Sequence, residues 1–153
     1  MKVRLNINGK DYESDIEPRM LLVDFIRDVA GLTGTHVGCE TGSCGSCTVL
    51  LDGRPVKSCL MLAAQAEGSK IITIEGISNE KSMNPVQKSL SETRALQCGF
   101  CAPGIVLTAT WFLSKNKNPD EEDVREALSG NICRCTGYQP IVDAVIKASK
   151  EVQ

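Results

Sequence analysis

Residues 38–47 read GCETGSCGSC, and this stretch contains three of the eight cysteines of the chain. Its three cysteines and a later one have the spacing C-x4-C-x2-C-x11-C, which defines a first thiol set of Cys39, Cys44, Cys47 and Cys59. Glycines at 38, 42 and 45 let the backbone approach closely and take positive φ. The stretch is therefore predicted to be a loop that wraps a small site of four thiolates.

The other four cysteines have the spacing C-x2-C-x31-C-x-C and define a second thiol set of Cys98, Cys101, Cys133 and Cys135. In a reducing compartment, cysteines at ligand spacing bind metal more often than they form disulfides. The first spacing is typical of plant-type [2Fe–2S] clusters. The second is compatible with zinc or iron–sulfur, and the neighbouring redox site favours iron–sulfur. A Rieske centre needs two histidines, whereas the chain has only His36.

The composition is that of an ordinary globular protein. The 153 residues carry a net charge of −2, with 42% hydrophobic residues and no basic stretch, so nucleic-acid binding has no electrostatic support. We see no apolar core of a signal peptide at the start, and no apolar run approaches the roughly 18 residues of a membrane span. A cytoplasmic location without a transmembrane segment is expected.

Residues 1–76 have the pattern of a small sheet domain. The first residues alternate apolar and polar, and Asn8-Gly9 is a strong hairpin signal. Residues 21–30 have helical spacing, Asp52-Gly53 marks a second hairpin, and an apolar strand follows at 70–74. These elements predict a β-grasp, ferredoxin-like domain.

Residues 77–153 have no strand pattern and are predicted to be all-helical. Proline and capping residues mark four helix starts: Asn84-Pro85, with a helix to about Gln97; Pro103-Gly104, to Leu113; Pro119; and Pro140. Both cysteine pairs of the second set then fall at helix junctions. The predicted fold class is α+β, with a β-grasp domain at 1–76 and a four-helix bundle at 77–153.

Three motifs together identify a family. GCETGSCGSC at 38–47, QCGFCAPG at 97–104 and NICRCTGY at 131–138 resemble the small iron–sulfur subunit of the molybdenum hydroxylases. This family includes relatives of xanthine dehydrogenase, aldehyde oxidoreductase and carbon monoxide dehydrogenase. The resemblance covers residues 2 to about 150, and all eight cysteines match the family's ligand positions.

The resemblance implies that the chain carries two [2Fe–2S] clusters between two partner subunits. A large subunit would hold molybdenum on a pterin, commonly in its cytosine dinucleotide form, and a medium subunit would hold FAD, in a dimer of heterotrimers. Electrons would pass from molybdenum to the second thiol set, then to the first set, then to FAD. Gln97 would contact the pterin, and Cys135 would lie on the pterin side.

Substrate chemistry would then take place in the large subunit, with no catalytic residue in this chain. A complex of the carbon monoxide or aldehyde/glyceraldehyde dehydrogenase type is expected ahead of the N-heterocycle and hydroxybenzoyl-CoA types. The sequence contains no dinucleotide-binding fingerprint and no P-loop. It also has no Ser/His/Asp or Cys/His set apart from the expected metal ligands, which agrees with a subunit that has no substrate site of its own. Two alternatives stay open: a stand-alone two-cluster ferredoxin and a zinc-stabilised interaction module.

Overall fold

The first half of the chain builds a mixed five-stranded sheet with the strand order β2-β1-β5-β3-β4. The computed structural model describes residues 1–79 and 82–152. The strands are β1 (Lys2–Ile7), β2 (Lys10–Asp15), β3 (Thr48–Leu51), β4 (Arg54–Lys57) and β5 (Lys70–Ile72). β1 pairs in parallel with β5, and the other pairings are antiparallel. Val3, Leu5 and Ile7 are fully buried, as their alternation predicts.

A helical segment covers this sheet, but it is not the regular helix predicted at 21–30. A short α-helix, α1 (Leu22–Asp24), continues directly into a π-helical turn, Phe25–Val29. Leu22, Phe25 and Ile26 are fully buried against the strands. The apolar spacing therefore predicts the buried face correctly. The backbone hydrogen bonds differ from the prediction, because Phe25–Val29 is π-helical and not α-helical.

Short 3₁₀ turns connect the later strands, at Ser58–Leu60, Ala63–Ala66 and Ile74–Gly76. The predicted strand at 70–74 is shorter, because β5 ends at Ile72. The backbone N–H of Thr73 donates to the side-chain oxygen of Asn8 at 2.9 Å instead of to a neighbouring strand. The hairpin asparagine thus ends the strand.

The second half contains α2 (Pro85–Glu92), α3 (Ala102–Lys115), α4 (Glu121–Ala127) and α5 (Gln139–Ser149). Asn84 caps α2 and Asp120 caps α4 through their side-chain oxygens, in agreement with the predicted helix starts. α2 ends at Glu92 and not near Gln97, since Arg94 adopts a left-handed φ of 52°. The N–H of Ala95 then donates to the carbonyl of Leu90, which completes a Schellman cap.

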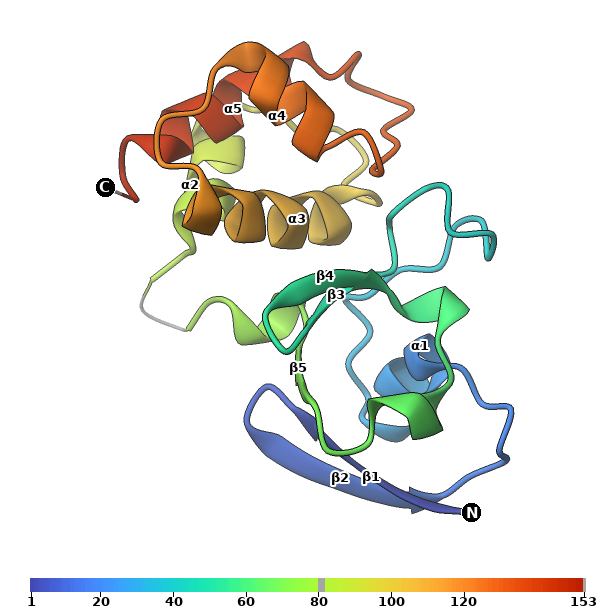
Figure 1. Ribbon diagram of the computed structural model, residues 1–153. Helices are drawn as coiled ribbons and strands as arrows, with labels where there is room; N and C mark the ends of the chain where they lie inside the picture. Colours follow the sequence, from blue (N-terminus) through green and yellow to red (C-terminus); the bar gives the residue numbers. More distant parts are fainter. Residues whose placement is uncertain (80–81, 153) are drawn as a thin grey trace.

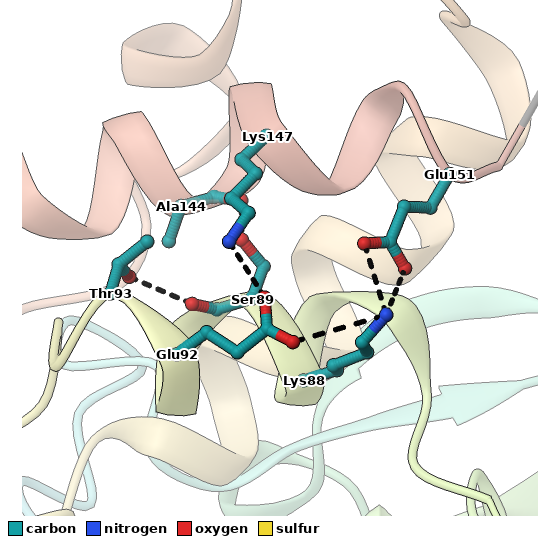
Figure 2. A network of polar contacts seen from close by, with 7 residues as sticks. All are labelled: Lys88, Ser89, Glu92, Thr93, Ala144, Lys147 and Glu151. Carbon is teal, nitrogen blue, oxygen red and sulfur yellow. Dashed lines mark hydrogen bonds and ion pairs between the residues drawn. The ribbon is translucent and has the colours of Figure 1, made fainter.

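Polar contacts fasten α5 to α2 (Figure 2). The hydroxyl of Ser89 donates to the carbonyl of Ala144 at 2.7 Å in a buried contact. Ion pairs lie around it at the surface: Glu92–Lys147 at 2.6 Å, Lys88–Glu151 at 3.1 Å and Lys88–Glu92 at 3.9 Å. The buried bond fixes the two helices, while the ion pairs are screened by water.

The two halves meet where α3 packs across the β3–β4 hairpin (Figure 1). Gly104, in the first turn of α3, lies so close to Gly45 that a Cβ atom there would come 2.1 Å from the Gly45 carbonyl oxygen. The mixed sheet followed by helices agrees with the predicted α+β class, and the four-helix bundle and the boundary at 76/77 stay predictions. Within the described residues, no helix is long and apolar enough to cross a membrane.

Candidate metal centres

The first thiol set lies at one end of the sheet domain. Residues 38–47 form an irregular loop between the helical segment and β3, and Cys59 lies in the 3₁₀ turn after β4. Cys47 and Cys59 are 2% and 4% exposed, whereas Cys39 and Cys44 are half-buried. Gly42 and Gly45 have the predicted positive φ. Gly38 does not, and it serves instead as a close approach to the Cys44 sulfur.

Hydrogen bonding and burial act in opposite directions on these thiols. The Thr41 side chain and the backbone N–H groups of Cys44 and Thr41 hydrogen-bond to Cys39 and lower its pKa to about 6. Burial raises the pKa of Cys59 to about 11, and its contact with Cys47 adds to that increase. The set is thus divided into a hydrogen-bonded Cys39–Cys44 pair and a buried Cys47–Cys59 pair.

The second thiol set lies in two turns of the helical half. Cys98 and Cys101 follow α2 at a distance and do not end it as predicted, because the helix stops at Glu92. Cys101 is the N-cap residue of α3, and Cys133 and Cys135 lie between α4 and α5. Each turn supplies one buried thiol, Cys101 or Cys133, and one exposed thiol, Cys98 or Cys135.

The four thiols of this set also form two pairs, each with one member from each turn. The sulfur of Cys135 lies 3.4 Å from that of Cys98. Cys101 and Cys133 hydrogen-bond through their side chains, and burial raises the pKa of Cys101 to about 12. Burial opposes ionisation of Cys133 as well, but hydrogen bonds from the Thr136 hydroxyl and from backbone N–H groups leave its pKa lowered.

These donors have the chemistry that a [2Fe–2S] cluster requires. Such a cluster takes four thiolates, two on each iron, and each set offers four thiols as two contacting pairs. The thiols therefore fit a two-iron group in which Cys39, Cys44, Cys47 and Cys59 would hold one cluster and Cys98, Cys101, Cys133 and Cys135 the other.

Gln97 lies at the exposed side of the second set. Its Nε2 atom donates to the carbonyl of Cys135 at 3.1 Å, and Gln97, Cys98 and Cys135 are all exposed. The structure thus brings together the two residues that were expected to face the pterin. Their contact with a pterin itself stays a prediction.

The loops of the two sets touch each other, a contact that the sequence does not predict. The N–H of Ile132 donates to the carbonyl of Cys44 at 2.8 Å, and Asn131 Nδ2 donates to the Gly45 carbonyl at 3.2 Å. The His36 ring stacks on Phe100 with centroids 4.8 Å apart, and its Nδ1 lies 2.7 Å from the Phe100 carbonyl oxygen. His36 is therefore a structural contact between the halves.

Comparisons with known proteins agree with this architecture. Residues 5–72 match the 2Fe-2S iron-sulfur cluster binding domain, and residues 73–146 match the [2Fe-2S] binding domain. The chain is 50% identical over 148 residues to the beta subunit of the 6-hydroxypseudooxynicotine dehydrogenase complex of Paenarthrobacter nicotinovorans, covering 96% of this chain and 92% of that one. It is 46% identical over 150 residues to the gamma subunit of caffeine dehydrogenase of Pseudomonas sp. strain CBB1, covering 96% and 90%.

A solved structure gives the same result for the fold. The crystal structure of quinoline 2-oxidoreductase from Pseudomonas putida 86 superposes with a TM-score of 0.95 at 49% identity, over 99% of this chain and 95% of the matched chain. Both halves and both cysteine loops fall within the matched ranges. The chain belongs to the small iron–sulfur subunits of xanthine dehydrogenase, aldehyde oxidoreductase and related molybdenum hydroxylases.

Proposed function

We propose that this chain is the electron-transfer subunit of a molybdenum hydroxylase, with one [2Fe–2S] cluster held by each thiol set. The observation that carries the proposal is the arrangement of eight free cysteines as two sets of four, with the loops of the two sets in direct contact. When bound, each cluster supplies a centre that accepts and releases one electron. The chain itself supplies the thiolates, the hydrogen bonds to them and the burial that limits contact with water.

The direction of the relay is proposed from the partner subunit that each thiol set would face. Gln97 and Cys135 are exposed at the second set, where a pterin of the large subunit would be contacted. The first set lies in the sheet domain and would face the FAD of the medium subunit. Substrate oxidation releases two electrons, so the chain would pass them one at a time from the second set to the first.

The partners are proposed as a large molybdenum–pterin subunit and a medium FAD subunit, in a dimer of heterotrimers in the cytoplasm. Relatives named as small, beta or gamma subunits support the presence of other subunits.

A complex of the carbon monoxide or aldehyde type remains our expectation from the sequence. The named relatives that act on nicotine derivatives, caffeine and quinoline give support to an N-heterocycle as substrate of the large subunit.

The test is an electron paramagnetic resonance (EPR) titration of the reduced, intact complex, together with iron and sulfide analysis. Two distinct spin signals from this chain, each integrating to one unpaired electron, are expected. A colourless, zinc-loaded protein without a reducible signal would instead establish the interaction module. A cluster-loaded monomer that purifies alone and reduces several soluble partners would establish the stand-alone ferredoxin.

A further inference from the structure

A closed ring of hydrogen bonds surrounds Cys133 in the turn before α5. The Thr136 hydroxyl donates to the Cys133 sulfur, with the two atoms 3.2 Å apart. The N–H of Tyr138 donates to the same Thr136 oxygen at 3.2 Å. The N–H of Cys133 donates to the Tyr138 phenol oxygen at 3.1 Å and completes the ring.

The backbone of this turn has a conformation that needs such support. Gly137 and Tyr138 have φ angles of 68° and 71°. The left-handed region suits glycine, but a bulky residue such as tyrosine rarely adopts it. Tyr138 is also the N-cap residue of α5, and its side chain makes no capping hydrogen bond to that helix. The bonds to Thr136 and Cys133 hold Tyr138 in place, and through it they hold the position of the Cys133 thiol.

We propose that Thr136 raises the reduction potential of the second cluster through its hydrogen bond to Cys133, and that Tyr138 positions this turn. The inference rests on the proposed function, since it assumes a cluster bound by the second thiol set. Reduction adds one electron, supplied by substrate oxidation in the partner subunit, and no proton moves. The added negative charge is shared with the ligand sulfurs, so a donor to a sulfur stabilises the reduced state more than the oxidised state.

The position of Cys133 makes this donor effective. Cys133 is 7% exposed, so water competes weakly with the Thr136 hydroxyl. Electrostatic contributions are larger in such a buried place than at the surface. Cys98 and Cys135 are exposed, and water can solvate their sulfurs in both redox states. A change at Thr136 is therefore expected to alter the potential, whereas changes among the exposed neighbours would have smaller effects.

The test is a redox titration of the whole complex followed by EPR, with Thr136→Val compared with Thr136→Ser. Valine keeps the shape and removes the hydroxyl, while serine keeps the donor. The second cluster's signal is identified as the one whose g-values change in Cys98→Ser. In Thr136→Val its reduced-to-oxidised ratio at a fixed potential should fall about tenfold, which for a one-electron couple is 59 mV. In Thr136→Ser it should stay near wild type, and the first cluster should not move in either variant.

Tyr138→Phe tests the positioning role separately. It leaves the Cys133 N–H without its phenol acceptor and should change the g-values of the second cluster at full iron content. An unchanged potential in Thr136→Val, or an equal shift of both clusters, would overturn the proposal for Thr136. Unchanged g-values in Tyr138→Phe would overturn the role of Tyr138.

A variant that loses iron does not leave the question open. If Thr136→Val lacks the second cluster, electron–nuclear double resonance on the wild type in H₂O and D₂O decides the matter. A strongly coupled proton at the second cluster that exchanges on brief exposure to D₂O, faster than the backbone N–H groups that also bond to Cys133, and that is retained in Thr136→Ser would support the hydrogen bond; its absence would overturn it. A wild-type complex without two spin signals would refute the proposed function itself, which is a separate outcome.

Discussion

The backbone N–H of Ile132 donates to the carbonyl oxygen of Cys44 at 2.8 Å, so the loop of one thiol set is hydrogen-bonded to the loop of the other. Asn131, the residue before Ile132 and 3% exposed, adds a bond to the Gly45 carbonyl. The two halves are therefore fixed to each other at their cysteine loops as well as along α3. Their relative position should depend on the few residues that allow this close contact.

Gly104→Ala should destabilise the contact between the halves. The added Cβ would lie 2.1 Å from the Gly45 carbonyl oxygen, which belongs to the backbone and cannot rotate away. Overpacking of this kind costs about 1–3 kcal/mol or more. Thermal unfolding of the cluster-loaded protein, followed by loss of visible absorbance, measures the change.

Gly130→Ala is the matched control for this variant. It lies in the same interface, but its added Cβ would meet only the Lys57 ammonium nitrogen at an ordinary distance of 3.5 Å. It should therefore unfold close to wild type. Equal losses in the two variants would show that the Gly45–Gly104 approach is not the limiting contact.

Removal of single thiols should affect the two sites independently. Cys101→Ala removes a buried thiol of the second set, and Cys47→Ala removes a buried thiol of the first. Each variant should lose one EPR signal and about half of its iron, because each cluster needs a ligand at all four positions and alanine offers none. Loss of both signals in each variant would mean that the clusters assemble only together.

Removal of all iron should unfold much of the chain. Four buried thiols lie in the two sites, and the loops around them have little regular structure to hold them without metal. Binding of metal by thiolates contributes free energy to folding, so chelation under reducing conditions should lower the melting temperature. Limited proteolysis should then cut first within 38–47 and 131–138. Identical melting and cleavage patterns with and without iron would contradict this dependence.

The sequence was sufficient for the elements that depend on local signals. The alternation in β1, the cap at Asn84 and the helix start after Pro119 are local signals, and the structure confirms them. The end of α2 was missed because Arg94, not a glycine, takes the left-handed position. The π-helical turn at Phe25–Val29 was missed because one shifted hydrogen bond hardly changes which side chains face the sheet.

The contact between the cysteine loops could not be predicted for a different reason. Gly104 follows a proline and looks like a helix start, and nothing near it in the sequence indicates that it faces Gly45. The spacing of the cysteines identified the two thiol sets because one [2Fe–2S] cluster takes four cysteine ligands. It contains no information on how one set is oriented toward the other, which depends on the packing of α3 against β3.

The contacts between α2 and α5 allow a comparison of a buried bond with an exposed ion pair. Ser89→Ala removes the donor to the Ala144 carbonyl, and Ser89 is 1% exposed, so a loss of about 1 kcal/mol is expected. Glu92→Gln weakens the ion pair with Lys147. The side chain of Glu92 is 43% exposed and that of Lys147 is 45% exposed. The effect of this substitution should be smaller than that of Ser89→Ala and should vanish in high salt.

The pH dependence of the two variants should differ as well. The hydrogen bond from Lys147 lowers the pKa of Glu92 below its usual value of 4.5, so the ionised pair stabilises the fold above that pH. This contribution is lost as the pH falls through the lowered pKa, where the folded carboxylate takes up a proton. The difference between wild type and Glu92→Gln should therefore close below pH 4.5, compared at equal iron content, while the loss in Ser89→Ala should persist because a hydroxyl does not titrate there. A Glu92→Gln effect that is independent of salt and pH would show that this glutamate acts through packing and not through its charge.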